Sequence, residues 1–277
     1  MKKAIKTKVV QFYKKYIIAK HVEKGLFYTG GRDNIGDSMV PWLIKNVSGS
    51  DLLYSNPREA TGPHLFTIGS ILQYADNNSN IWGSGFISKN SKVHSKPSNI
   101  HAVRGPLSSH RLKELTGFEC NVFCDPALLT ARFIKPESTL GRNKIGLIPH
   151  YVDKNKISKT KIIMNESVKL CDVETSDIQK FVNEICSCEI VISSSLHGII
   201  LAEAFGITAI WAKFGEDVYG NDFKFYDYYL STGRAGIEPE CFYRITEDHL
   251  SNRKKLSQSV IARMSDSLLE CYPNAFK

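Results

Sequence analysis

The chain has 277 residues, of which 42% are hydrophobic, and a formal net charge of +8. A chain of this length can bury one large hydrophobic core or two smaller ones. Residues 1–24 hold eight lysines against one acid, so this arm carries seven of the eight excess charges and the rest of the chain is nearly neutral. We therefore expect no nucleic-acid partner, because a nucleic-acid-binding fold would carry its basic excess on the body.

Cysteine usage and apolar runs indicate the compartment. The seven cysteines form no Cys-x-x-Cys pair and no Cys/His zinc spacing, a pattern typical of free thiols in a reducing cytoplasm. No apolar run approaches the ~20 residues of a membrane-spanning helix, and no signal peptide is visible. Because no acidic triad or metal-ligand cluster appears either, we expect a cytoplasmic protein that needs no metal and no cofactor.

The chain begins with a basic amphipathic pattern. Residues 4–18 combine apolar residues at helical spacing with interleaved lysines, which predicts a helix that either docks on the protein body or lies on an anionic membrane surface. Residues 26–28 predict a short strand leading into a loop rich in Gly, Asn and Asp, which can bring its backbone close to a ligand. Asp37 at the end of this loop is expected to cap a helix that runs through Val47.

The next part of the chain repeats one pattern, in which a short apolar strand ends at small residues such as Gly83 and Ser84. This repetition is typical of a doubly wound sheet whose loops gather at one edge. Arg104 ends the last of these strands, before a helix expected at 107–115. Its planar fork of donors suits a carboxylate or a phosphate, or else a structural ion pair. The strands are expected at residues 65–68, 81–82 and 100–103.

Residues 134–143 are polar and contain Pro and Gly, so they predict a linker to a second unit. In that unit His150 ends the first strand, and Ser176 is expected to cap a helix with one apolar face. A long loop is expected over 213–235, and a final helix at 251–271 is expected to cross back to the first unit. The expected strands of the second unit are residues 144–149, 161–164, 189–192 and 208–212.

The stretch 189–206 gives the strongest indication of a site. A β-branched run predicts a strand buried on both faces, and a helix follows it from Leu196. His197 stands at the first turn of that helix beside Gly198, and the free N–H groups of a helix start suit an anion. A serine-capped helix with a locally hydrogen-bonded histidine is the other interpretation. Three hydroxyl groups join the strand to the helix, those of Ser193, Ser194 and Ser195.

These segments resemble blocks of the polysaccharide pyruvyl transferase family, in the order in which that family has them. The most recognisable is SSSLHG at residues 193–198, followed by an AEAFGI-like segment. The resemblance covers residues 25–235 and leaves out the basic arm, and Cys124 departs from the Gly of the family's Gly-Asp-Pro block. The other matching blocks are GGRDNIGD (30–37), IGSIL (68–72), WGSGF (82–86), AVRGPLS (102–108), CDPALL (124–129), IGLIPHY (145–151) and FKFYDYYLSTGR (223–234).

The resemblance implies an α/β fold of two Rossmann-like units that face a cleft, as in GT-B glycosyltransferases. Together with the basic amphipathic N-terminal helix, this arrangement gives the domain boundaries that we expect. They are an arm at residues 1–24, Rossmann-like units at 25–135 and 144–250, and a C-terminal helix at 251–277 that packs back on the first unit.

The activity that the resemblance implies is transfer of a pyruvyl group from phosphoenolpyruvate to two hydroxyls of one sugar. The product is a cyclic ketal, and phosphate is released. The acceptor is then a glycan or a lipid-linked oligosaccharide, in exopolysaccharide or capsule biosynthesis for the cell envelope. The basic arm suits a peripheral position on the anionic inner face of the membrane.

The donor's chemistry assigns the main roles. His197 is the expected general acid, since imidazole titrates near neutral pH and an adjacent dianion favours its protonated form. Arg104 is the first choice for the carboxylate or phosphate of the donor. Some relatives carry an Arg where this chain has Ser195, so the missing charge falls to His150, Lys224 or Arg234, among which the sequence does not choose. The candidates for substrate contact are Asn34, Asp37, Gly83, Ser84, His150, Ser193, Ser194, Ser195, Leu196, Lys224 and Arg234.

Two alternative functions stay open at this point. A nucleotide-sugar glycosyltransferase of the same architecture would use Glu203 to hold a ribose and His197 as a base. A non-catalytic sugar-binding module would not need Arg104 and His197 to converge on one anion site.

Overall fold

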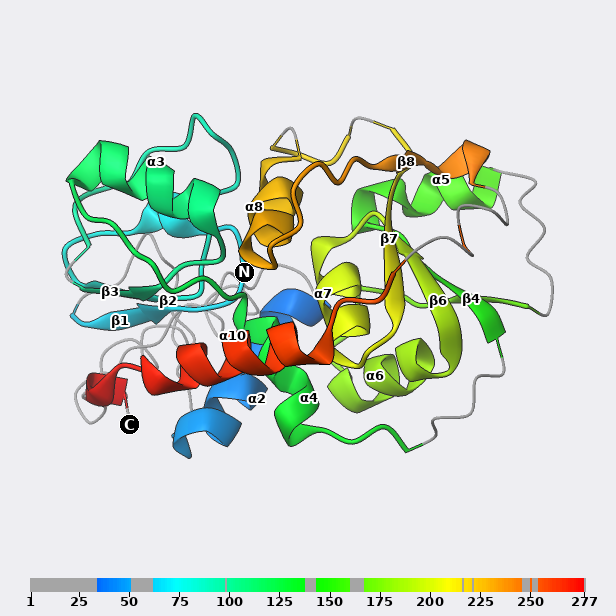
Figure 1. Ribbon diagram of the computed structural model, residues 1–277, viewed down its shortest axis with the longest axis horizontal. Helices are drawn as coiled ribbons and strands as arrows, with labels where there is room; N and C mark the ends of the chain where they lie inside the picture. Colours follow the sequence, from blue (N-terminus) through cyan, green and yellow to red (C-terminus); the bar gives the residue numbers. More distant parts are fainter. Residues whose placement is uncertain are drawn as a thin grey trace, which may run out of the picture.

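The computed structural model describes residues 34–50, 62–97, 99–137, 143–159, 167–215, 217–220, 222–245, 250 and 254–276. These residues form an α/β protein with two sheets of parallel strands and helices packed around them (Figure 1). The predicted α/β class is therefore confirmed, whereas the GT-B-like arrangement and the domain boundaries stay predictions. The expected N-terminal helix and the expected strands at 26–28 and 161–164 lie outside the described residues.

Three short strands make the first sheet, in the order β1-β2-β3. The parallel register pairs Leu65 with Asn80, and one further parallel bridge joins Val103 to Phe123. The strands predicted at residues 65–68, 81–82 and 100–103 are all present, with slightly shifted ends. The elements, with η for 3₁₀ helices, are α2 (Ile35–Ser48), β1 (His64–Phe66), η2 (Leu72–Tyr74), β2 (Ser79–Trp82), β3 (Asn99–Ala102), α3 (Pro106–Thr116), η3 (Pro126–Leu129) and α4 (Thr130–Phe133).

Five parallel strands make the second sheet, in the order β5-β4-β6-β7-β8. Ile148 at the end of β4 pairs with Ser193 at the end of β6, which pairs with Trp211 of β7. These carboxyl ends share one edge, where α/β proteins place their ligands. The elements are β4 (Asn143–Ile148), η4 (Tyr151–Asp153), α5 (Lys154–Lys159), β5 (Val168–Leu170), α6 (Ile178–Cys186), β6 (Cys188–Ser193), α7 (Leu196–Ala204), β7 (Thr208–Lys213), α8 (Phe223–Ser231), β8 (Glu240–Cys241), η5 (Phe242–Arg244), α10 (Gln258–Glu270) and η6 (Asn274–Phe276).

Two helices begin at a different cap from the one predicted. α2 is capped by Asn34, whose Oδ1 accepts a first-turn N–H at 3.0 Å, and Asp37 lies in its first turn instead. α6 is capped by Asp177 rather than Ser176, and the Asp177 carboxylate accepts a first-turn N–H at 2.9 Å. Neighbouring polar residues can serve as caps equally well, so the sequence leaves the choice open. The predicted apolar face of α6 is confirmed by the buried side chains of Ile178, Phe181, Val182 and Ile185.

The largest difference from the prediction is α8, which lies within the stretch expected to be a loop. Its aromatic residues have modest helix propensity, so the sequence pattern conceals the helix. Burial stabilises it instead, since Phe225 stacks on Trp211 with ring centroids 4.5 Å apart and Tyr228 is fully buried. α8 also packs against α3 (Figure 1). It thereby joins the half of the protein that contains the first sheet, residues 34–133, to the half that contains the second sheet, residues 143–245.

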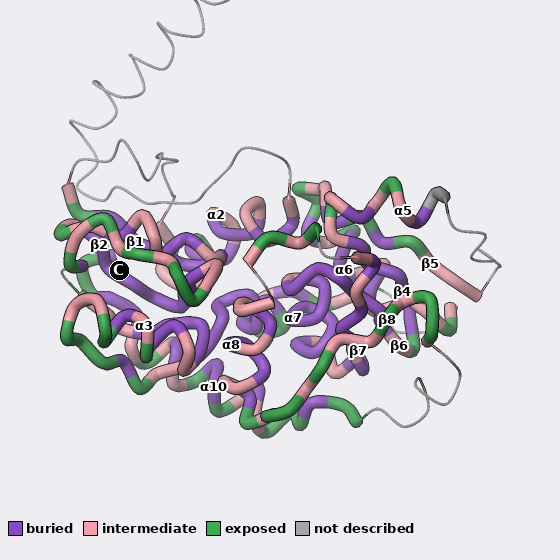
Figure 2. The backbone as a smooth tube through the Cα atoms, turned by 90° about the horizontal axis from the view of Figure 1, so that it is seen from above, coloured by how far each residue is buried: buried purple, intermediate pink, exposed green. Residues whose placement is uncertain are grey.

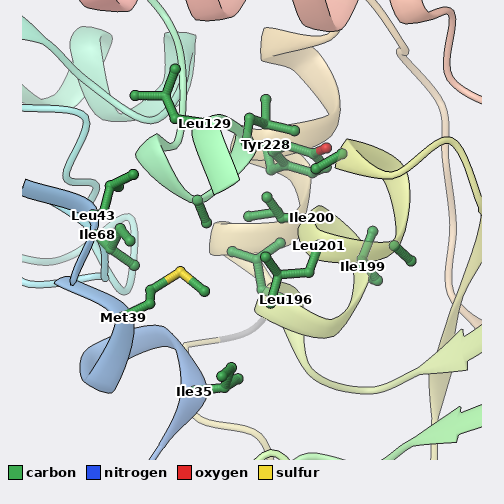
Figure 3. Packing of buried hydrophobic residues seen from close by; sticks show 14 of the residues in the cluster. Ile35, Met39, Leu43, Ile68, Leu129, Leu196, Ile199, Ile200, Leu201 and Tyr228 are labelled. Carbon is green, nitrogen blue, oxygen red and sulfur yellow. The ribbon is translucent and has the colours of Figure 1, made fainter. Parts of the chain in front are cut away.

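One hydrophobic cluster extends between the two sheets. It includes Met39 and Leu43 of α2, Leu129 of η3, Ile199 of α7 and Tyr228 of α8. Figure 3 shows these side chains around one common space, with α2 on one side and α7 on the other. The halves therefore share a core, which fixes α2 and α7 relative to each other.

The C-terminal helix α10 crosses from the second half to the first sheet (Figure 1). Trp82 Nε1, at the end of β2, donates to the carbonyl of Leu268 at 2.9 Å, and its ring meets Tyr272 edge-on with centroids 4.9 Å apart. In Figure 2 many buried residues lie in the middle of the molecule, where almost every residue of α7 is buried. No helix in the described part of the chain is both long and apolar enough to cross a lipid bilayer.

Candidate active site

The serine turn after β6 is fixed by its own hydroxyl groups. Ser193 Oγ lies 2.8 Å from a carbonyl oxygen of β4 and accepts the N–H of Ser195 at 2.9 Å. Ser194 Oγ accepts the N–H of His150 at 2.9 Å and donates to Asp153 at 2.8 Å. The loops after β4 and β6 are therefore tied together at the carboxyl edge of the second sheet.

The helix α7 starts at this turn, and no side chain in the described part of the chain caps its first N–H groups. Ser195 is its N-cap residue in an extended conformation, yet its side chain makes no capping hydrogen bond. The first N–H groups of a helix lack intrahelical partners, and the helix dipole is positive there. Gly198 in the first turn is required by packing, because a Cβ at this position would lie 2.5 Å from Ser193 Oγ. The start of α7 can therefore bind an anion through its backbone.

His197 lies between the first turns of two helices. A Cβ on Gly36 of α2 would lie 2.1 Å from His197 Nδ1, so the imidazole packs directly on the α2 backbone. Its Nε2 atom is buried and has no hydrogen-bond partner among the described residues. Burial, with the charges of Lys224 and Arg104, lowers the pKa of His197 to about 3. The imidazole is therefore neutral at physiological pH before an anion binds.

Four of the predicted basic residues form one cluster. Burial, with the charge of Arg104, lowers the pKa of Lys224 to about 8, although the carboxylates of Asp222 and Asp153 oppose this shift. Burial, with the charges of Lys224 and His197, lowers the pKa of His150 to about 3. Within the described residues no carboxylate lies at ion-pair distance from Lys224 Nζ. Within this cluster His150 and His197 are therefore neutral at physiological pH and Arg104 is paired with Asp227, so Lys224 carries the charge that no described carboxylate pairs.

Arg104 forms the structural ion pair that the sequence left open. Its side chain is fully buried, and Nε donates to Oδ2 of Asp227 at 3.0 Å. Its two terminal nitrogens donate to Ser70 Oγ and to the carbonyl of Phe86, each at 2.6 Å. Gly85 packs against the guanidinium, since a Cβ there would lie 2.4 Å from Cζ. Arg104 contributes positive potential to the cluster, while direct contact with a donor stays a prediction.

Comparison with known proteins decides the family. The family model of the polysaccharide pyruvyl transferases matches residues 5–212. The chain belongs to this family. A similar protein, uncharacterized protein L143 of Acanthamoeba polyphaga mimivirus, is 34% identical over 199 residues, which cover 68% of this chain and 67% of the relative.

Membership makes the protein a transferase of pyruvyl groups with a polysaccharide acceptor. The matched region also corrects the expected extent of the resemblance. It begins at residue 5 and so includes most of the basic arm, and it ends at residue 212, before the predicted block at 223–234. Lys224 and Arg234 therefore lie beyond the part of the chain that the family model matches.

The predicted site residue Arg234 forms an ion pair with Glu203 in this pyruvyl transferase family member. Its terminal nitrogens donate to the two carboxylate oxygens of Glu203 at 2.6 Å and 2.8 Å, and Tyr228 donates to the same carboxylate at 2.6 Å. Glu203 is 2% exposed. Both of its oxygens are thus used inside the protein, which opposes the alternative in which Glu203 holds a ribose.

The other predicted contacts of the first half have local structural roles. Asn34 caps α2. Gly83 has φ +95° and packs on Pro126, whose Cγ would lie 2.3 Å from a Cβ there. Ser84 is fully buried, and its hydroxyl donates to the carbonyl of Gly69 at 3.1 Å. Their contact with substrate stays a prediction, as does that of Asp37 in the first turn of α2.

Three residues of the site went unnoticed in the sequence. Asp153 is 1% exposed and bonds both Ser194 and Lys156, so it orders the loop after β4. Gly36 provides the backbone against which the imidazole of His197 packs. Asp227 holds Arg104, and the one signal for it was an acid within an otherwise aromatic run. Each acts through a contact between distant segments, which a single sequence does not display.

Proposed function

We propose that this protein transfers the pyruvyl group of phosphoenolpyruvate to two hydroxyls of one sugar in a polysaccharide or its lipid-linked precursor. The observation that carries the proposal is the convergence of His150, His197 and Lys224 at the positive end of α7. A lysine with no described ion-pair partner, two imidazoles that a bound anion can protonate and the N–H groups of a helix start together suit a small polyanion.

The donor's anionic groups match this cluster. Phosphoenolpyruvate carries a phosphate and a carboxylate, which need several cations and hydrogen-bond donors close together. Lys224 is half-buried and has no carboxylate at ion-pair distance among the described residues, so its ammonium is available for an anion. The backbone N–H groups of Leu196 and His197 at the start of α7 supply further donors. The charge of Arg104, which is paired with Asp227, also acts on His197.

We propose that His197 delivers a proton to the enol carbon. A bound dianion beside it raises the pKa of His197 and favours the imidazolium. In the proposed reaction His197 protonates the methylene carbon, positive charge develops at C2, and the first sugar hydroxyl adds there. The second hydroxyl then displaces phosphate from C2. Of the two protons that the hydroxyls lose, one returns to His197 and the other goes to the released phosphate. A general acid of this kind typically contributes about 10²–10⁴-fold in rate.

The test compares donors by thermal stabilisation and turnover. A ligand that binds the folded state raises the apparent stability by mass action. We expect stabilisation by phosphoenolpyruvate, and phosphate release when a sugar acceptor is added. Stabilisation by a nucleotide sugar instead would favour the glycosyltransferase, and stabilisation by a glycan alone would favour a binding module.

The basic arm remains a separate proposal about location, because residues 1–33 lie outside the described part of the chain. Each lysine near an anionic leaflet contributes about 1 kcal/mol of binding. We expect the full chain to float with anionic vesicles at low salt and to leave them at high salt. A variant with the arm lysines changed to Gln should stay in solution; equal flotation of this variant would contradict a membrane role for the arm.

A further inference from the structure

Asp227 is a buried carboxylate that joins the two halves of the protein. It belongs to α8, and its side chain is fully buried. Its Oδ2 accepts Arg104 Nε at 3.0 Å and Ser108 Oγ at 2.6 Å, and its Oδ1 accepts the N–H of Ser108 at 2.9 Å. Each of these partners lies at the end of β3 or the start of α3, on the other half of the molecule.

The helix α3 depends on this carboxylate for its cap. Its N-cap residue is Gly105, which has no side chain, and its first residue is Pro106, which has no N–H. The N–H of Ser108 in the first turn would otherwise lack a partner. Asp227 supplies the side-chain oxygen that Ser or Asp at an N-cap position usually supplies. α8 can approach closely enough because a Cβ on Gly105 would lie 2.0 Å from the carbonyl oxygen of Asp227.

The same contact determines where two cations of the site lie. Lys224 precedes Asp227 by three residues on α8, and residues at this spacing share one face of a helix. Arg104 is bonded by Asp227 directly, and its charge acts on Lys224 and His197. Moving Asp227 would therefore displace Lys224 together with α8 and release Arg104 from its fixed orientation.

We propose that Asp227 is a positioning residue for the donor site. From α8 it caps α3, and it thereby holds Lys224 and Arg104 in place around His197. This role rests on the proposed function, because it concerns the site that binds the donor. Asp227 itself does not touch substrate in this proposal.

The direct test is Asp227→Asn, which keeps the size of the side chain and removes its charge. We expect the KM for phosphoenolpyruvate to rise about tenfold or more, since misplacement of binding groups by about 1 Å has large effects. The matched control is Glu203→Gln, which breaks the ion pair with Arg234 and alters the carboxylate that Tyr228 of α8 bonds. The control should lose stability without a change in KM. Equal KM in Asp227→Asn and wild type would overturn the positioning role.

A second readout needs no donor. Lys224 is faced by Arg104, Asp222, Asp153, His150 and His197. In Asp227→Asn the charge of Arg104 is no longer balanced, so the pKa of Lys224 should fall further. The measurement is the NMR titration of Lys224 Nζ in both proteins, and an unchanged midpoint would contradict the proposal.

The outcomes separate this inference from the proposed function. A wild-type protein that neither binds nor converts phosphoenolpyruvate overturns the proposed function, and the lysine titration still tests the positioning role. If Asp227→Asn does not fold, Ser108→Ala removes one partner of the carboxylate and keeps its charge. We expect a smaller rise in KM, about two- to fivefold, with an unchanged titration of Lys224. A wild-type KM in Ser108→Ala would then count against the role.

Discussion

The contact between Gly36 and His197 makes a sharp prediction for the variant Gly36→Ala. The new Cβ would lie 2.1 Å from Nδ1 and 2.3 Å from Cε1 of the imidazole, whereas ordinary contact begins at 3.4 Å. The ring must therefore move by roughly 1 Å or more, since the helix backbone of α2 cannot yield as easily. A displacement of this size typically costs about 10²-fold in rate, which corresponds to about 2.7 kcal/mol of transition-state stabilisation.

The same variant should remain folded. Overpacking costs about 1–3 kcal/mol, and replacing Gly by Ala within a helix returns about 0.5–1 kcal/mol. The net loss is small against a typical stability of about 5–15 kcal/mol. Steady-state phosphate release from phosphoenolpyruvate and a thermal melt measure the two effects separately.

Gly49→Ala at the other end of α2 is the matched control. Its Cβ would meet no atom within 4 Å, but Gly49 has φ +73°, so Ala there is strained. We expect a loss of about 1 kcal/mol of stability with unchanged turnover. Wild-type turnover in Gly36→Ala, or an equal loss in both variants, would refute the proposed placement of His197.

Three further predictions concern pH, an ion pair and metals. The pKa values of His150 and His197 are about 3 against an ordinary 6.5, so their contribution to stability is complete above pH 6.5 and falls as the pH drops toward 3; urea titrations of a His150→Gln/His197→Gln variant should show a weaker acid dependence. Glu203→Gln should lose about 3 kcal/mol of stability, measured by urea unfolding, because it leaves Arg234 without its partner, yet it should keep the affinity for the donor. Activity should survive exhaustive EDTA treatment, and a loss that Mg²⁺ restores would contradict a metal-free mechanism.

The junction of β6 and α7 was predictable because its signals are local. A β-branched run, three serines and a helix-forming segment determine a buried strand, a turn and a helix start without help from the rest of the chain. The structure places His197 at that start, and His150 follows the neighbouring strand at the same edge. Parallel pairing thus converts a pattern along the sequence into a cluster in space.

The environment of Arg104 was not predictable in this way. An arginine at the end of a strand suits either an anionic ligand or a carboxylate of the protein. The deciding partner, Asp227, is 123 residues further along the chain and lies on a helix that aromatic residues conceal. A single sequence gives no information on such long-range contacts, so the sequence could predict the charge of Arg104 and not its partner.

Calorimetric titration with phosphoenolpyruvate tests the central claim most directly, namely that the His150, His197 and Lys224 cluster binds this donor and that His197 delivers the proton. Titration at neutral pH in two buffers of different ionisation enthalpy reports the protons taken up on binding. Because His197 has a pKa of about 3 before binding, we expect wild type to bind the donor with net proton uptake, and His197→Gln to lose most of that uptake. Absence of binding, or binding with the same proton uptake in His197→Gln, would contradict the account.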